Sequence, residues 1–392
     1  MSGTHRTHSS RPRRSLTRRG KLVAAGATIA VVAGGALGYF VLFPQQAPAF
    51  VRDTLQSVGL AGPEAGAPDA TCPLTGEPVP GSEVPERAAL AIKIENAPEA
   101  RPQASLNEAD VVVEEPVEGG YTRFIAIFQC GDSSRVGPVR SGRTTDPDFL
   151  RQLGPAVFGY AGGRNIVTRE VPAVGLVDVN YIIAADAYVR DETRAAPHDL
   201  YTTTAALWKA ARSRDGAPDP MFTYAADWEG AAKKIRSAHL PFSGVSDVYW
   251  QWNGAKGAWL RSHGDVPHVL EGNERVSAAN VVVQVVTVTD SDFLDSAGNP
   301  SPEVELTGSG KAYVLRDGTV IRGRWERESL KDVTTFVAKD GTEIELAPGR
   351  TWVELLPSWV AVELTRRTGP RPPSRRGRRG RIRTAPSPSP SG

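Results

Sequence analysis

Charged residues are concentrated in a segment that must also contribute to a hydrophobic core. The stretches "EEPVEGGYTRF" and "RVGPVRSGR" carry arginines and glutamates on both sides of the apolar run 124–128. Such charges are costly on a core-forming strand unless they are solvated, paired or in contact with a ligand. Arginine presents a planar fork that suits carboxylate and phosphate groups. The candidate binding residues are Glu114, Glu118, Arg123, Arg140 and Arg143.

Two alternatives to an anion-binding site stay open at this point. The same charges could form an internal Arg–Glu network that ties a loop to the sheet, because ion-pair networks are common in proteins. Alternatively, Asp110, Glu114 and Glu118 could supply the two carboxylates that hydrolyse a glycosidic bond. His198 could serve such an enzyme, but the sequence has no G-x-S-x-G motif and Ser141 is merely a suggestive nucleophile, so contact of His198 with the backbone or a ligand is the preferred interpretation. A hydrolase or transferase is therefore a rival to a binding protein.

Metal and cofactor chemistry finds less support in the sequence. His263, Asp265 and His268 lie close together, but their spacing matches no specific metal motif. A polar hairpin loop explains them more simply. We expect neither a metal site nor a cofactor.

The first 43 residues predict export. The basic stretch "RPRRSLTRRGK" precedes the uncharged run 22–43, which would span roughly 33 Å as a helix, about the thickness of a hydrocarbon core. A basic flank places the N-terminus in the cytoplasm and the rest of the chain outside. The sequence Ala47-Pro48-Ala49 has the form of a signal-peptide cleavage site, but the apolar run is long for a signal peptide. A single-pass anchor is therefore favoured, and a secreted protein is the alternative.

The chain has a net charge of +2, which hides basic ends and an acidic middle. The Arg-rich C-terminal tail could bind nucleic acid by charge alone, but the predicted topology places it outside the cytoplasm. No specific nucleic-acid partner is expected.

The two cysteines, Cys72 and Cys130, both follow the anchor. An even pair in an oxidising compartment predicts one structural disulfide.

The pattern of predicted secondary structure changes near residue 241. Before it, extended segments are expected at 88–94, 111–114, 121–128 and 156–160, with helices at 144–153 and 202–214 and a capping box at Ser105–Glu108. After it, Asn253-Gly254, Asp317-Gly318 and Asp340-Gly341 predict hairpins. The fold class is α+β: an α/β-type N-terminal domain, then a smaller, mostly antiparallel β domain. The expected divisions are a basic tail 1–21, an anchor or signal 22–43, a linker 44–71, an N-terminal domain 72–219, a connection 220–240, a C-terminal domain 241–365 and a disordered Arg-rich tail 366–392.

Several motifs together resemble the YerB-like family of bacterial lipoproteins, a two-domain family of unassigned biochemical function. They are "CPLTGEPV", "RPQASLNEADVVVEEPVEGGYTRF", "VGPVRSGR", "APHDLYT", "NVVVQ", "GSGKAYVLRDGTVIRGRWER" and "PGRTWVELLP". The resemblance covers about residues 72–357. It places the polar motif of the family on Asn96, Arg101, Pro102, Asp110, Glu114, Glu118, Gly119, Gly120, Arg123, Arg140, Ser141 and Arg143, with His198 and Tyr201 further on. Glu95, Glu115 and Pro116 depart from the family pattern, and no lipobox cysteine follows the apolar run.

These observations predict a membrane-anchored, extracytoplasmic envelope protein. Its leading function is binding of an anionic envelope component, such as a peptidoglycan fragment or wall polymer, through the polar motif. A motif made mainly of charges and glycines is more typical of a site than of core packing. The rivals are an envelope hydrolase or transferase, and a protein-interaction module that uses the aromatic residues of "YWQWNGAKGAWL" to meet a membrane partner.

Overall fold

The computed structural model describes residues 70–79, 81, 83–212, 216–295 and 297–366. The predicted basic tail, the membrane anchor and most of the linker lie outside the described residues. So does the predicted Arg-rich tail 366–392, except for Arg366, which belongs to a strand. Within the described ranges, no helix is both long and apolar enough to cross a membrane.

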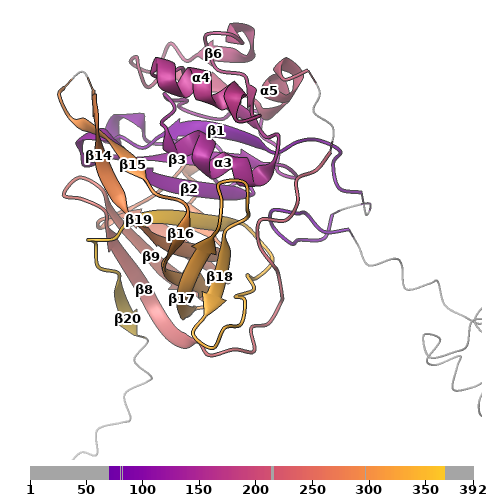
Figure 1. Cartoon of the computed structure of the whole chain (residues 1–392), viewed down its shortest axis with the longest axis vertical. Coiled ribbons are helices and arrows are strands. Elements are labelled where there is room, and N and C mark those ends of the chain that lie inside the picture. The colour runs from indigo at the N-terminus through magenta and orange to yellow at the C-terminus, as the bar shows by residue number, and fades with distance from the viewer. Residues whose placement is uncertain (1–69, 80, 82, 213–215, 296, 367–392) are drawn as a thin grey trace, which may run out of the picture. The chain divides into compact units, whose positions relative to one another are not determined.

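A large mixed sheet organises the described residues (Figure 1). The described residues form one compact unit. The strands of the main path follow one another in space as β11 (Val266–Pro267), β10 (Ala258–His263), β9 (Asp247–Asn253), β8 (Lys233–Pro241), β17 (Thr319–Arg327), β16 (Gly308–Arg316), β13 (Asn280–Val286), β19 (Thr351–Pro357), β2 (Val111–Pro116), β3 (Thr122–Phe128), β1 (Leu90–Glu95), β4 (Val157–Gly159) and β5 (Val177–Asp178). Side branches of the sheet are β12 (Ser277–Ala278) on β10, β18 (Thr335–Ala338) on β17 and β20 (Glu363–Arg366) on β8.

Two further pairs lie outside this sheet, and three α-helices accompany its N-terminal part. The pairs are β6 (Tyr188–Arg190) with β7 (Leu200–Thr202), and β14 (Val288–Leu294) with β15 (Pro300–Val304). The helices are α3 (Thr145–Leu150), α4 (Asn165–Ala173) and α5 (Thr204–Ala210). Thr203 caps α5, because its side chain accepts a hydrogen bond from the backbone N–H of Ala206 at 3.0 Å.

The expected strands and hairpins are present. Residues 90–95, 111–116, 122–128 and 157–159 are extended, and Asn253 and Asp317 stand at the turns of β9–β10 and β16–β17. The described C-terminal residues contain strands and no α-helix. Their ladders are antiparallel except for β13, which runs parallel to β19.

The capping box predicted at Ser105 to Glu108 begins no helix. Ser105 has φ of 65°, and the carbonyl of Ser105 accepts a hydrogen bond from the N–H of Glu108, so the segment forms a turn. The serine hydroxyl donates instead to the carbonyl of Arg135. The Ser105 side chain therefore makes a long-range hydrogen bond to Arg135 in place of the predicted helix cap. Serine side chains can bond to backbone groups outside a helix as well as cap one.

One strand joins the two halves of the sequence. β19, near the C-terminus, runs parallel to β2 on one side and to β13 on the other. Its Thr351 lies opposite Val111 and Asn280. The N-terminal and C-terminal regions therefore share one continuous sheet.

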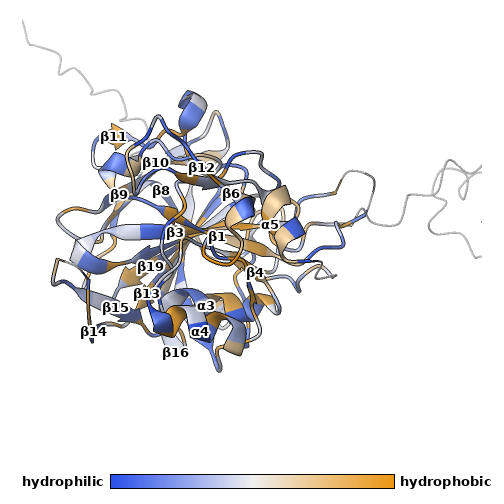
Figure 2. Ribbon diagram, turned by 90° about the horizontal axis from the view of Figure 1, so that it is seen from above, coloured by the Kyte–Doolittle hydropathy of each residue, from blue (hydrophilic) through white to orange (hydrophobic). Residues whose placement is uncertain are grey.

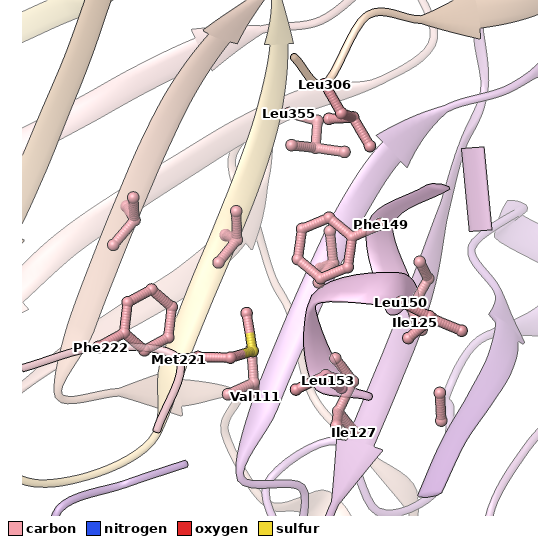
Figure 3. Packing of buried hydrophobic residues seen from close by; sticks show 14 of the residues in the cluster. Val111, Ile125, Ile127, Phe149, Leu150, Leu153, Met221, Phe222, Leu306 and Leu355 are labelled. Carbon is pink, nitrogen blue, oxygen red and sulfur yellow. The ribbon is translucent and has the colours of Figure 1, made fainter. Parts of the chain in front are cut away.

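Both faces of this sheet are covered by apolar side chains. One face packs against α3 and the segment around Met221, and Figure 3 shows this cluster with Val111, Ile125, Ile127, Phe149 and Leu355. The opposite face holds Ile92, Val112, Phe124 and the buried rings of Trp250 and Trp352. In the view from above, hydrophobic colour lies on central strands such as β1 and β4, and hydrophilic colour on peripheral segments (Figure 2).

Candidate functional site

The alternation of side chains along β1, β2 and β3 distributes the charged residues between two faces of the sheet. Glu95, Arg123 and Glu115 lie directly opposite one another on the three strands. Opposed residues share a face, and the next residue along a strand faces the other way. Glu114 therefore points away from Arg123, although it is the immediate neighbour of Glu115.

A pocket of about 370 Å³ opens at this end of the strands. It contains six of the nine predicted site residues: Glu118, Arg123, Arg140, Ser141, Arg143 and His198. The remaining lining residues are Glu95, Ala97, Glu99, Val117, Tyr121, Thr122 and Asp295. Asp295 comes from the end of the hairpin β14–β15, so the pocket draws on both halves of the sequence.

Glu95 holds two of the basic groups in the pocket. Its Oε2 lies 2.6 Å from Nε of Arg140 and 3.0 Å from Nδ1 of His198. The Glu95 side chain is 7% exposed. A buried carboxylate shared in this way fixes the imidazole ring, and among the described residues no hydrogen bond to Nε2 of His198 is present.

Glu118 anchors the second arginine. Its Oε2 accepts hydrogen bonds from Nε and Nη2 of Arg143 at 2.9 and 2.5 Å, and its Oε1 accepts one from the hydroxyl of Ser301 at 2.8 Å. Burial opposes ionisation of Glu118, but the hydrogen bonds and charge of Arg143 outweigh it and lower the pKa. The pair also fixes hairpin β14–β15, because Ser301 lies on β15.

Arg123 is the cation of the pocket that lacks a carboxylate partner. Its residue surface is 9% exposed, and Nη1 donates to the carbonyl of Ser141 at 3.0 Å. In the part of the chain that the structure describes, no carboxylate forms an ion pair with it. Burial, together with the nearby charge of Arg143, lowers the pKa of Arg123 to about 10. The group therefore remains charged at neutral pH and has N–H groups to offer to a ligand.

Glu114 lies in a separate, buried network on the opposite face of the sheet. Its two oxygens accept hydrogen bonds from Nη2 of Arg261 at 2.9 and 2.6 Å, and both side chains are fully buried. Glu354, opposite Glu114 on β19, belongs to the same network. Burial and the charge of Glu114 raise the pKa of Glu354 well above its usual value. Glu114 is therefore buried in this network and lies outside the pocket that holds six of the other predicted site residues.

Arg101 also lies outside the pocket. Its Nη2 donates to the carbonyl of Asn96 at 2.8 Å. Burial and the charge of Arg261 lower the pKa of Arg101 to about 10. The side chain thus belongs with the buried Arg261 network.

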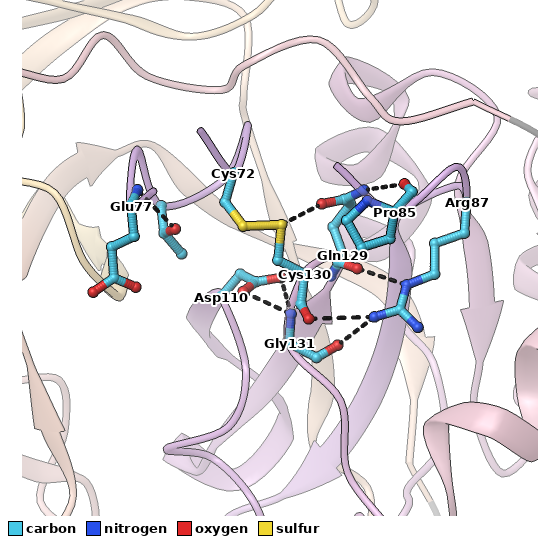
Figure 4. Close-up of a disulfide and its surroundings, with 9 residues drawn as sticks. Cys72, Glu77, Pro85, Arg87, Asp110, Gln129, Cys130 and Gly131 are labelled. Carbon is cyan, nitrogen blue, oxygen red and sulfur yellow. Dashed lines mark hydrogen bonds between the residues drawn. A yellow bond between two sulfur atoms is a disulfide. The ribbon is translucent and has the colours of Figure 1, made fainter. Parts of the chain in front are cut away.

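Asp110 stabilises the chain around the disulfide, which joins Cys72 and Cys130 as predicted (Figure 4). Its carboxylate accepts hydrogen bonds from the backbone N–H groups of Gln129 and Gly131 at 2.5 and 3.0 Å. Burial raises the pKa of Asp110, and these backbone hydrogen bonds oppose that effect. Asp110, Glu114 and Glu118 thus occupy three different environments, which argues against a shared role as the carboxylate pair of a glycosidase.

A second buried network lies behind the pocket, and the sequence interpretation did not include it. Nζ of Lys93 donates to carboxylate oxygens of Glu115 and Asp146. The other oxygen of Asp146 accepts the backbone N–H of Arg143 at 2.6 Å, which connects this network to the pocket. Burial and the charge of Asp146 raise the pKa of Glu115 to about 7. Strict alternation on β1 and β2 could have identified Lys93, Glu95 and Glu115 as residues of one face.

Two further expectations from the sequence are corrected. His268 is not in a solvated loop: it is 1% exposed, and its Nδ1 lies 2.9 Å from Nη1 of Arg261. Trp250 and Trp259 of "YWQWNGAKGAWL" are fully buried, so within this stretch contact with a partner would fall to the half-buried Tyr249 and Trp252. Among the residues that the structure describes, no group of three or more His, Cys, Asp or Glu side chains is arranged to hold a metal ion.

Comparisons with known proteins identify the family. Models of the N-terminal and C-terminal domains of "Protein of unknown function (DUF3048)" match residues 74–217 and 238–353. The "Putative lipoprotein YerB" of Bacillus subtilis (strain 168) is 26% identical over 307 residues, which cover 76% of this chain and 89% of that protein. The crystal structure of the YerB protein from Bacillus subtilis shares the fold, with a TM-score of 0.65 and 24% sequence identity over 75% of this chain and 100% of that one. The chain belongs to the YerB-like family, whose two domains have no assigned function.

Proposed function

We propose that this protein is a membrane-associated, extracytoplasmic envelope protein that binds an anionic envelope ligand in the pocket around Arg123. The observation that carries the proposal is the Arg123 guanidinium, which is buried, lacks a carboxylate partner among the described residues and lines a pocket. A buried charge is stabilised by a partner of opposite sign, and a ligand carboxylate or phosphate would provide one. The volume of about 370 Å³ suits a fragment the size of a sugar or short peptide.

Arg140 and Arg143 also support anion binding in the pocket, although both already form ion pairs. Each is held by a carboxylate, Glu95 or Glu118, so that two guanidinium groups stand near Arg123 in fixed positions. Such an arrangement reduces the entropy that binding must overcome. The envelope location is supported by the basic and apolar N-terminal sequence and by the lipoprotein name of the Bacillus subtilis relative.

The binding test is a titration of the purified full-length chain with peptidoglycan fragments and anionic wall polymers, followed by calorimetry. We expect Arg123→Gln to weaken binding at least about tenfold, the loss of one charge-assisted contact. Arg236→Gln, which changes an exposed arginine on β8, is the matched control and should bind as the wild type does. Equal affinity of wild type and Arg123→Gln would refute the proposal.

An enzyme that uses His198 is a second candidate function. The supporting observation is that Glu95 holds Nδ1 of His198 inside the pocket, an arrangement that orients the other ring nitrogen for proton transfer. Chemical analysis of a bound ligand after prolonged incubation separates the two functions. An unchanged ligand indicates a binding protein, whereas turnover that is lost in His198→Gln indicates an enzyme.

A further inference from the structure

Some of the charged residues that line the pocket form ion pairs with each other, and others do not. Among the lining residues, two carboxylates are already engaged, Glu95 with Arg140 and Glu118 with Arg143. Setting aside these two pairs and His198, which shares Glu95 with Arg140, leaves the guanidinium of Arg123 and the two carboxylates of Glu99 and Asp295. In the described residues, neither Glu99 nor Asp295 forms an ion pair with a basic side chain.

The unpaired charges also differ in depth. Arg123 lies on a central strand and is 9% exposed, whereas Glu99 is exposed and Asp295 is half-buried. Hydrogen bonds from the side chain and backbone of Asn299 lower the pKa of Asp295, so it is ionised at neutral pH. Among the lining charges without an ion-pair partner, the positive one is therefore buried and the two negative ones are closer to solvent.

Part of the pocket lining is apolar. Val117 and Tyr121 line the pocket, and Tyr121 is 39% exposed. A ring of this kind offers a contact surface to the uncharged middle part of a ligand. The pocket thus combines an inner anion site, an aromatic contact and an outer cation site.

We propose that the ligand is a zwitterion: a short peptide whose carboxylate meets Arg123 and whose ammonium group meets Glu99 and Asp295. This inference rests on the proposed function and narrows it. A wall fragment that carries a peptide with a free amine fits this charge pattern, whereas a polymer with negative groups alone would place repulsive charge beside the two outer carboxylates. Charge complementarity of both signs would also fix the direction in which the peptide enters.

The test compares three probes on the full-length chain: alanyl-alanine, N-acetyl-alanyl-alanine and alanyl-alanine amide. Titration followed by NMR or calorimetry is suited to the weak affinity of such small ligands. We expect alanyl-alanine to bind at least about fivefold more tightly than either blocked probe, because each blocked probe lacks one charge. In the variant Glu99→Gln/Asp295→Asn, alanyl-alanine should no longer bind more tightly than N-acetyl-alanyl-alanine. It should still bind more tightly than alanyl-alanine amide, because Arg123 is unchanged and the amide probe has no carboxylate.

Each outcome decides between the two proposals. If N-acetyl-alanyl-alanine binds as tightly as alanyl-alanine, or if no dipeptide binds while an anionic wall polymer does, the zwitterion inference is refuted and the proposed function stands. If Arg123→Gln leaves the binding of every anionic ligand unchanged, the proposed function fails as well. Equal thermal midpoints for the outer double variant and the wild type show that the substitutions at these solvent-facing positions have not altered folding.

Discussion

The buried pair of carboxylates on β2 and β19 leads to a double-mutant prediction. Glu114 binds Arg261 through both oxygens, and Glu354 lies opposite it on β19. Burial and the charge of Glu114 raise the pKa of Glu354, so we expect Glu354 to be protonated in the folded wild type. Nε1 of Trp250 donates to Oε1 of Glu354 at 2.7 Å. Glutamine can accept the same hydrogen bond, so Glu354→Gln should change the free energy of unfolding by less than about 1 kcal/mol.

The substitution Glu114→Gln removes the carboxylate that binds Arg261, and loss of one partner of a buried ion pair normally costs about 3–5 kcal/mol. Here the loss should be only about 1–2 kcal/mol, because Glu354 can ionise once the neighbouring negative charge is gone and can take over as the counterion. The double variant has no carboxylate left for Arg261 and should lose the full ~3–5 kcal/mol, which gives a coupling energy of about 2 kcal/mol.

Urea unfolding followed by tryptophan fluorescence measures these differences on the full-length chain. Glu305→Gln, which changes an exposed glutamate, is the control and should shift the free energy of unfolding by less than about 0.5 kcal/mol. Additive effects of the Glu114 and Glu354 substitutions would refute the idea that one carboxylate can replace the other. A Glu354→Gln loss as large as that of Glu114→Gln would show instead that Glu354 is already ionised.

Two further predictions concern the other buried groups. Folding raises the pKa of Glu115 from 4.5 to about 7, so the folded state binds a proton more readily than the unfolded state. As the pH rises from about 4.5 to about 7, the wild type should therefore lose stability relative to Glu115→Gln. The loss in the free energy of unfolding should reach up to roughly 3 kcal/mol. Urea midpoints of both proteins across this range provide the measurement, and a difference that does not vary with pH would contradict the assigned cause. Replacing Cys72 and Cys130 with serine should lower the free energy of unfolding by about 2–5 kcal/mol, because the bridge closes a loop with a sequence separation of 58. A reducing agent should destabilise the wild type and leave the serine variant unchanged; equal stability of the two proteins under oxidising conditions would be inconsistent with this role.

The strands and hairpins could be predicted because their signals are local. The continuous apolar runs of β1 to β3 and the Asn253-Gly254 and Asp317-Gly318 turns depend on residues that are neighbours in the sequence. The disulfide was also predictable, since Cys72 and Cys130 are the two cysteines of the chain.

The composition of the site was predictable only in part, because long-range pairing decides which charges are already neutralised. No feature of residues 110–118 reveals that Arg261, far along the chain, binds Glu114, or that Ser301 reaches Glu118. The sequence therefore groups residues that the sheet separates. The sequence likewise does not predict that Asp295 lines the pocket, because this depends on the position of hairpin β14–β15 in the fold.

The position of β19 has a consequence for how this chain acquires its structure. During synthesis β2 appears early, but the strand that covers one of its edges begins only at Thr351. Until then the edge of β2 exposes unpaired backbone groups, which is a condition that favours aggregation. Contacts between such distant segments also slow folding. We therefore expect the N-terminal region to need protection until almost the whole chain has emerged, and a chain that ends before residue 351 to aggregate rather than form an independent domain.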